Sequence, residues 1–309
     1  MKNFINIKDI SKKNLRKILT DAKFRKQSRR KLNTLDVDKK SPLSGKLLIQ
    51  MFEKSSLRTR ISFYLAIKQL GGGALTLRKD ELHLGPDGEN LSDVAKILST
   101  YGDAFILRTD SEKKLREFAR NLKIPLINGL SPNSHPAQII SDIFTIEEIK
   151  RKSISKLNIC WIGDSNNVLT SLIEASIKLN FKLNIICPKK YSPKQNLINY
   201  IKKNKGKITV SHNPLFGASN ADVLMTDKVI SMNDKVNIKE KLNHFKDFKI
   251  NEKLLKVVKK SCIILHCLPR ANEISDKIIF GKNSKVWQQA MNRVHVQKSI
   301  LLYCFDKLR

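Results

Sequence analysis

Hydroxyl and basic side chains are concentrated in one short segment, Phe52-Glu53-Lys54-Ser55-Ser56-Leu57-Arg58-Thr59-Arg60. The segment leads into a run with helical spacing, and the start of a helix carries unpaired N–H groups and a partial positive charge that bind phosphate. Arg58 adds a planar fork that can contact two oxygens of an oxyanion. A capped helix with solvated arginines would explain a single Ser-x-Arg. Three hydroxyl and three basic residues within seven positions favour an anion-binding site instead.

Two further polar segments follow apolar, strand-like runs. In Ser131–Gln138, His135 precedes Pro136 at the start of a predicted helix, so its imidazole would be held at the end of a strand. The segment Trp161–Asn167 occupies the place of a nucleotide-binding turn but lacks the Gly-x-Gly-x-x-Gly spacing that close approach to a pyrophosphate requires. A small polar substrate is therefore favoured over a dinucleotide at this turn.

The last two polar segments are Asp227–Met232 and His266–Arg270. Cys267 beside His266 is compatible with a thiol nucleophile. Adjacent residues of an extended chain point to opposite faces, however, so His266 is badly placed to activate Cys267. A cysteine that binds or polarises a substrate is the preferred interpretation, and a cysteine that merely ends a core strand remains open. No Cys or His pair in the sequence has the spacing of a structural zinc site.

The elements that must position these residues alternate between short β-branched runs and segments of helical period, which is typical of α/β folds. The predicted strands are Lys46–Met51, Ala74–Leu77, Asp103–Leu107, Ile124–Ile127, Asn158–Ile162, Leu183–Ile186, Ile208–Ser211, Asp222–Met225 and Cys262–Leu265. After an amphipathic first helix over Met1–Lys26, the predicted helices are Leu57–Leu70, Ser92–Tyr101, Glu112–Leu122 capped by Ser111, Ala137–Lys152, Asn167–Leu179, Pro193–Lys203, Glu252–Lys260 and Val286–Phe305.

We therefore predict an α/β protein with two doubly wound parallel-sheet domains joined by helices. The expected boundaries are 1–136 and 137–290, with 291–309 a C-terminal helix that packs back on the first domain. In such folds ligands bind at the carboxyl ends of the strands, where the five polar segments are expected to lie.

The 309 residues include 59 Lys and Arg against 28 Asp and Glu, a formal net charge of +31. A basic protein bound to nucleic acid is one interpretation. The lysines are spread along the chain without a dense tail or a basic stripe interleaved with aromatic residues, so compositional drift is preferred and no nucleic-acid partner is expected. No apolar run approaches the roughly 18 residues of a membrane span, so no membrane partner is expected either. Five scattered cysteines and the absence of a secretory signal favour a cytoplasmic setting.

Eight segments, in chain order, resemble motifs of the aspartate/ornithine carbamoyltransferase family. They are Phe52–Arg60, His83-Leu84-Gly85, Asn128-Gly129-Leu130, His135–Gln138, Trp161–Asn167, Asp227–Met232, His266–Arg270 and Asn292-Arg293. The likeness runs from about Phe4 to Leu302. Cys267 stands where the aspartate branch has proline, and together with the Asp227-x-x-x-Ser231-Met232 pattern it resembles the ornithine branch.

The resemblance implies transfer of the carbamoyl group of carbamoyl phosphate to the δ-amino group of L-ornithine, giving L-citrulline and phosphate, in arginine biosynthesis or, in reverse, in citrulline catabolism. It implies no cofactor and no metal, because the amine is itself the nucleophile. The residues it assigns to carbamoyl phosphate are Ser56, Leu57, Arg58, Thr59, His83, Arg108, His135, Gln138, Cys267, Leu268 and Arg293. The residues it assigns to ornithine are Asn167, Asp227, Ser231 and Met232. Within this set, catalysis would fall to Arg58, Arg108, Asp227 and Cys267.

The resemblance also implies a homotrimer with active sites between subunits, in which His83 reaches the site of a neighbour. Two positions depart from the family pattern. Leu57 stands where the family usually has Thr, which keeps a backbone N–H but removes a hydroxyl. Asn233 stands where the ornithine branch usually has Gly, and Asn is the side chain that best imitates glycine at positive φ. A related amine such as putrescine or N-acetylornithine therefore remains an alternative acceptor.

Overall fold

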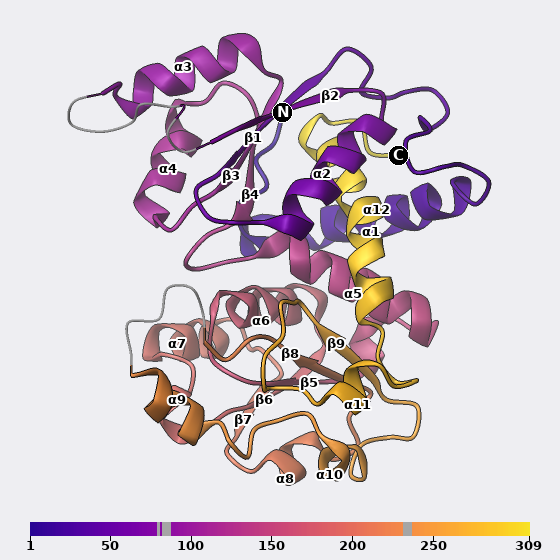
Figure 1. The fold of residues 1–309 in the computed structure, drawn as a ribbon, viewed down its shortest axis with the longest axis vertical. Helices are drawn as coiled ribbons and strands as arrows, with labels where there is room; N and C mark the ends of the chain where they lie inside the picture. Colours follow the sequence, from indigo (N-terminus) through magenta and orange to yellow (C-terminus); the bar gives the residue numbers. More distant parts are fainter. Residues whose placement is uncertain (79–80, 82–87, 231–236) are drawn as a thin grey trace. The chain divides into compact units, whose positions relative to one another are not determined.

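The computed structural model describes residues 1–78, 81, 88–230 and 237–309. They form two compact units, Met1–Phe144 together with Met291–Arg309, and Thr145–Ala290. Each unit is built on one parallel β-sheet with helices against it (Figure 1). The predicted fold, α/β with two doubly wound parallel sheets joined by helices, is confirmed.

The sheet of the first unit has the strand order β2-β1-β3-β4. Its strands are β1 (Leu47–Phe52), β2 (Gly73–Leu77), β3 (Ala104–Arg108) and β4 (Leu126–Leu130). All neighbouring pairs are parallel, and the register places Phe52 beside Arg108. From β1 the chain winds first to β2 on one side and then back to β3 on the other. This reversal between β1 and β3 is where ligands bind in such folds.

Helices cover both faces of the first sheet. They are η1 (Ile7–Asp9), α1 (Lys12–Ser28), α2 (Leu57–Gln69), α3 (Leu91–Tyr101), α4 (Glu112–Asn121), the first part of α5 (Pro136–Lys150) and, from Met291 onward, α12 (Val286–Cys304). Helices α3 and α4 pack on one face, where Leu98 and Phe118 share a core cluster with Ile49 and Phe105 of the strands (Figure 1). Helix α4 begins as predicted, because the side chain of Ser111 accepts a hydrogen bond from the N–H of Lys114.

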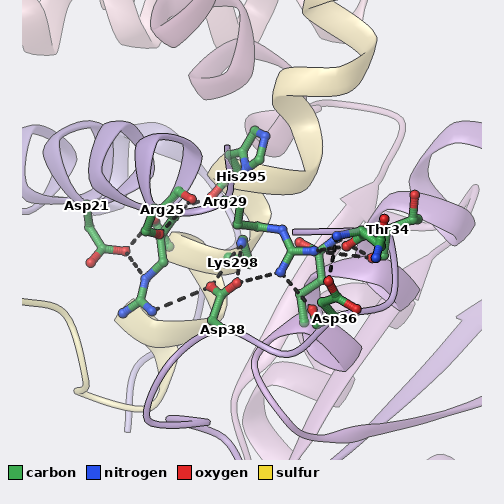
Figure 2. Close-up of polar contacts among 12 residues, drawn as sticks. Asp21, Arg25, Arg29, Thr34, Asp36, Asp38, His295 and Lys298 are labelled. Carbon is green, nitrogen blue, oxygen red and sulfur yellow. Dashed lines mark hydrogen bonds and ion pairs between the residues drawn. The ribbon is translucent and has the colours of Figure 1, made fainter. Parts of the chain in front are cut away.

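A cluster of buried charges joins α1, the chain near Asp38 and α12 (Figure 2). Asp38 accepts hydrogen bonds from Arg29 Nη1 at 2.7 Å and from Lys298 Nζ at 3.0 Å, and it lies 3.6 Å from Arg25 Nη1. Arg25 also pairs with Asp21 at 3.4 Å. All five side chains are buried, and that of Lys298 is 0% exposed. These five residues are called the Asp38 cluster below.

The sheet of the second unit has the strand order β7-β6-β5-β8-β9. Its strands are β5 (Asn158–Ile162), β6 (Lys182–Ile186), β7 (Ile208–Ser211), β8 (Val223–Thr226) and β9 (Ile263–His266). All pairs are parallel, and Thr226 lies beside His266. The winding reverses between β5 and β8, which predicts a second ligand-binding edge in this unit.

The helices of the second unit are the rest of α5, η3 (Ile154–Lys156), α6 (Asn167–Leu179), η4 (Lys189–Tyr191), α7 (Gln195–Lys203), α8 (Pro214–Ala218), α9 (Ile238–His244), α10 (Glu252–Leu255), α11 (Asp276–Ile279) and the start of α12. On one face, Phe245, Phe248 and Leu254 join Leu224 and Ile264 of the strands in a single core cluster. Among the helices of the described residues, none combines the length and the apolar character needed to cross a bilayer.

Several predicted boundaries were wrong for identifiable reasons. The first helix begins at Lys12, where Ser11 caps it, and not among the earliest residues. Strand β4 begins after Pro125 instead of at Ile124, because proline has no N–H to donate to a neighbouring strand. The helix predicted over Glu252–Lys260 ends at Leu255, before the β-branched Val257 and Val258.

Candidate active site

In the first unit, the segment after β1 is tied to the end of β3. The N–H of Glu53 donates to the carbonyl of Arg108 at 3.0 Å, and Arg108 Nη1 donates to Ser56 Oγ at 3.1 Å. Ser56 is the N-cap residue of α2, yet its side chain makes no capping hydrogen bond. The hydroxyl therefore pairs with an arginine and leaves the first N–H groups of α2 without the usual cap, which is the arrangement that an anion completes.

A second arginine enters the same region from α12. Arg293, which is 2% exposed, donates from Nη2 to Thr59 Oγ1 at 2.7 Å and from Nη1 to Gln138 Oε1. The amide of Gln138 is oriented in turn, because its Nε2 donates to Asp142 Oδ1 at 2.7 Å. Thus α2 supplies Thr59, α12 supplies Arg293 and α5 supplies Gln138 and Asp142 to a single hydrogen-bonded group.

His135 lies within the field of these arginines. Burial lowers the pKa of its imidazole well below the usual value, and the positive charges of Arg293, Arg108 and Arg58 lower this pKa further. The ring is therefore neutral at neutral pH. A neutral imidazole held among cations can donate a hydrogen bond to a carbonyl oxygen without adding a charge of its own.

In the second unit, Asp227 lies just beyond the end of β8 and accepts three hydrogen bonds. Cys267 Sγ donates to Oδ1 at 2.8 Å, the N–H of Lys228 donates to Oδ1 at 2.7 Å, and Asn166 Nδ2 donates to Oδ2 at 2.9 Å. Burial raises the pKa of Asp227 above its ordinary value, while the hydrogen bonds from Cys267, Lys228 and Asn166 oppose that rise. The result is a half-buried carboxyl group whose two oxygens are fixed in direction.

The side chain of His266 forms hydrogen bonds with the loop that follows β9. The N–H of Leu268 donates to His266 Nδ1 at 2.8 Å, so the ring proton is on Nε2, which donates to Glu273 Oε1 at 2.8 Å. The same Glu273 oxygen accepts from the N–H of Ala271 at 2.6 Å. Both ring nitrogens of His266 are therefore engaged in hydrogen bonds. The thiol of Cys267 donates to Asp227, which agrees with the prediction that His266 is badly placed to activate it.

Known proteins are similar to this chain over nearly its whole length. Residues 2–148 match the aspartate/ornithine carbamoyltransferase carbamoyl-P binding domain, and residues 155–304 match the Asp/Orn binding domain of the same family. An ornithine carbamoyltransferase of Rhizorhabdus wittichii is 38% identical over 309 residues, covering 99% of each chain. One from Agrobacterium fabrum is 37% identical over 305 residues, covering 98% of this chain and 97% of its own. The ornithine carbamoyltransferase structure from Pyrococcus furiosus superposes with a TM-score of 0.89 at 35% identity, covering 97% and 96% of the two chains.

The chain belongs to the aspartate/ornithine carbamoyltransferase family. The family recognised from eight sequence motifs is thereby confirmed.

The structure brings together the family-motif residues within each unit. In the first unit these are Ser56, Leu57, Arg58, Thr59, Arg108, His135, Gln138 and Arg293. Leu57 is 70% exposed, so most of its side chain is not packed within the unit. In the second unit, Asp227, Cys267 and Leu268 lie at the ends of β8 and β9, and Asn167 is the first residue of α6. His83, Ser231 and Met232, together with the departure Asn233, fall outside the described residues.

Two carbamoyltransferase residues with clear structural roles were not singled out from the sequence. Asn166, and not its neighbour Asn167, donates to Asp227, while its Oδ1 caps α6 by accepting from the N–H groups of Val168 and Leu169. Asn before a helical run is a recognisable N-cap signal, and it could have identified Asn166 as the fixed member of the pair. Glu273 had no comparable signal, because its pairing with His266 depends on how the loop folds.

Proposed function

We propose that the chain transfers the carbamoyl group of carbamoyl phosphate to the δ-amino group of L-ornithine, giving L-citrulline and phosphate. The observation that carries this proposal is that the two units differ in charge at the sheet edges where ligands are expected to bind. The first unit presents Arg58, Arg108 and Arg293, which suit a dianionic phosphate, and the second presents the carboxyl group of Asp227, which suits an amine. The relatives that match over the full chain are named for this reaction.

Carbamoyl phosphate is proposed to bind in the first unit, with its phosphate at the start of α2. The backbone N–H groups of Leu57 and Thr59 and the guanidinium groups of Arg58 and Arg108 would neutralise the leaving phosphate. His83, implied by the family motif, would contribute from a neighbouring subunit.

The carbamoyl group itself is proposed to lie against His135, Gln138 and Arg293. Donors directed at its carbonyl oxygen would stabilise the negative charge that grows there as the amine attacks. The carbonyls of Cys267 and Leu268 would accept from the carbamoyl NH2. The carbon–nitrogen bond then forms while the carbon–oxygen bond to phosphate breaks, and phosphate leaves with the electron pair.

Ornithine is proposed to bind in the second unit through Asn167, Asp227, Ser231 and Met232. An alkyl amine is protonated at neutral pH, with an ordinary pKa near about 10.4, and must lose that proton before it can attack. Asp227 suits this task because burial raises the pKa of its carboxyl group, and the hydrogen bond from Cys267 fixes the direction of that group. Catalysis is then mostly positioning and charge, and the amine is the nucleophile.

The test is a colorimetric assay for the ureido group of the product, with ornithine, putrescine, N-acetylornithine and aspartate offered separately, each with carbamoyl phosphate. Ornithine should be the preferred acceptor. Arg58→Ala should lower kcat by about 100- to 1,000-fold, the effect of removing one preorganised donor from a developing charge. Turnover with another amine and none with ornithine would reject the acceptor but keep the reaction class.

The homotrimer is proposed on the same family likeness, and an exposed apolar face of the first unit supports it. Leu57, Ile61 and Tyr64 of α2 are 70, 48 and 41% exposed, and their spacing places them on one side of the helix. Leu75 of β2 is also exposed, at 49%. Apolar side chains gathered on one face favour an interface over solvent.

Light scattering coupled to size-exclusion chromatography tests the trimer, and Ile61→Asp should lower the mass toward that of one chain. Sharing of sites is tested by mixing His83→Ala with Arg58→Ala chains after dissociation and reassembly. If one site needs both residues from different chains, the mixture should regain activity that neither variant has alone. Equal inactivity of the mixture would reject sites shared between subunits.

A further inference from the structure

A buried ion pair at the carboxyl edge of the second sheet has no part in the chemistry proposed above. Lys241 on α9 is 2% exposed, and its Nζ lies 2.6 Å from Asp164 Oδ2. The same ammonium group lies 5.5 Å from the ring centroid of Tyr191. A charge withdrawn from water is tolerated only where its partners are fixed. The pair therefore holds α9 against the turn that follows β5.

Asp164 is fixed from three directions within that turn. Its Oδ1 accepts from the N–H of Ser165 at 2.8 Å, and its Oδ2 accepts from Lys241. Its backbone carbonyl accepts from Trp161 Nε1 at 3.1 Å, and Trp161 is a fully buried residue of β5. The position of the turn is thus set by the sheet on one side and by Lys241 on the other.

The turn carries Asn166, which is the link to the acceptor half of the site. Its Oδ1 is committed to capping α6, so its Nδ2 can point in only one direction, toward Asp227 Oδ2. The other oxygen of Asp227 accepts from Cys267. A shift of the turn would move one of the three hydrogen bonds that aim the Asp227 carboxyl group, and it would leave those from Cys267 and from the N–H of Lys228 in place.

We propose that Lys241 is a positioning residue for the amine acceptor, acting through Asp164 and Asn166 on Asp227. The inference rests on the proposed function and adds to it a residue that contacts neither substrate. A misplacement of about 1 Å in a reacting geometry can cost on the order of 100-fold in rate. Loss of the ion pair therefore acts on the use of ornithine and not on the affinity for carbamoyl phosphate, whose proposed phosphate contacts are in the other unit.

The second unit offers a matched control at the opposite edge of the same sheet. Lys259 Nζ lies 2.9 Å from both carboxylate oxygens of Asp222, which stands just before β8 at the amino ends of the strands. Asp222 also accepts from the N–H of Asn158 at 2.9 Å, so this pair too joins a side chain to the sheet. Lys259→Met removes a lysine–aspartate ion pair whose lysine side chain is 41% exposed, from the edge that carries no site residue.

The experiment compares Lys241→Met, Lys241→Arg, Asp164→Asn and Lys259→Met with the wild-type chain. Lys241→Met should lower kcat/KM for ornithine on the order of 100-fold and leave KM for carbamoyl phosphate at the wild-type value. Lys241→Arg keeps the charge and should restore most of the loss. Lys259→Met should leave both parameters unchanged.

A pH profile separates positioning from a general loss of folded protein. The hydrogen bond from Asn166 lowers the pKa of Asp227, so its loss raises that pKa. The acidic limb of kcat/KM for ornithine should then move to higher pH in Lys241→Met, whereas partial unfolding would scale the profile without moving it. If Lys241→Met does not fold, Asp164→Asn is tested by the same two measurements.

The outcomes are distinguishable. If the wild-type chain makes no citrulline from ornithine, the proposed function fails. If it does, and Lys241→Met and Asp164→Asn keep the wild-type acidic limb and the wild-type kcat/KM for ornithine, the positioning role alone is refuted. Equal losses in Lys241→Met and Lys259→Met would also refute it, because the effect would then not depend on the edge of the sheet.

Discussion

Replacing Asp38 by Asn should destabilise the first unit far more than removing Lys298, although the two residues are partners. The Asp38 cluster contains three buried cations, Arg25, Arg29 and Lys298, and two buried carboxylates, Asp21 and Asp38. Asp38→Asn keeps the size of the side chain but removes the negative charge that all three cations share and replaces one of its two acceptor oxygens by an NH2 donor. Leaving buried charges without a partner costs about 3–5 kcal/mol, so the free energy of unfolding should fall by that amount.

Lys298→Met should not lower the stability of the first unit. It removes the one cation in excess and leaves two arginines paired with two carboxylates. Burial, only partly offset by Asp38, lowers the pKa of Lys298 from 10.5 to about 8. A shift of that size corresponds to about 3 kcal/mol against the charged form in the folded state. Methionine avoids this penalty and fills a similar volume, so the variant should be as stable as the wild-type chain at pH 7 or more so.

The pH dependence follows with a definite sign. Between pH 8 and 10.5 the unfolded chain holds a proton on Lys298 that the folded chain has lost. Stability therefore rises with pH through this window, by at most about 1.4 kcal/mol per pH unit for one group. The difference in unfolding free energy between wild type and Lys298→Met should shift in favour of wild type over the same range, while groups common to both chains cancel.

Urea unfolding followed by far-UV circular dichroism measures these differences. Both tryptophans, Trp161 and Trp287, lie in the second unit, so their fluorescence is a poor reporter of the Asp38 cluster and circular dichroism is preferred. The reasoning is refuted if Lys298→Met loses more stability than Asp38→Asn at pH 7. A wild-type-to-Lys298→Met difference that is flat from pH 8 to 10 would refute the assigned titration.

Three further expectations concern activity. Cys267→Ala removes a hydrogen bond that lowers the pKa of Asp227, so the acidic limb of kcat/KM for ornithine should move to higher pH; an unmoved limb would mean that another group titrates. Arg293→Lys keeps the charge but loses the planar fork that donates to Thr59 and Gln138 from two separate nitrogens, so KM for carbamoyl phosphate should rise while KM for ornithine holds, and the reverse pattern would contradict this. Added NaCl should lower kcat/KM for carbamoyl phosphate as it screens the net charge of +31; a rate independent of salt would leave compositional drift as the sufficient account.

The sheet framework was predictable because buried parallel strands leave a local signature. Asn158–Ile162, Ile208–Ser211 and the helix Asn167–Leu179 have the bounds expected from apolar runs and turn residues alone. The short helices α8 and α9 were not predicted. At five and seven residues they are too short to show a helical period, and tertiary packing of residues such as Phe245 stabilises them.

The polar residues that follow strands could also be predicted from the sequence, because they stand next to recognisable apolar runs. The burial of Lys241 and Lys298 could not be predicted. The excess of lysines was attributed to compositional drift, yet Lys241 and Lys298 are almost fully buried. Their carboxylate partners are 77 and 260 residues away along the chain. Nothing local distinguishes such a lysine from an exposed one, because burial is a property of the folded neighbourhood.

The separation between Asp38 and Lys298 also bears on how the protein is made. The first unit consists of Met1–Phe144 and Met291–Arg309, and even the N–H of Lys2 donates to the carbonyl of Cys304. During synthesis the N-terminal segment, with Arg25, Arg29 and Asp38 already translated, therefore cannot complete its unit until Met291–Arg309 have left the ribosome. The inserted Thr145–Ala290 has all its strands before then, so the part of the chain translated second is the first that can finish folding.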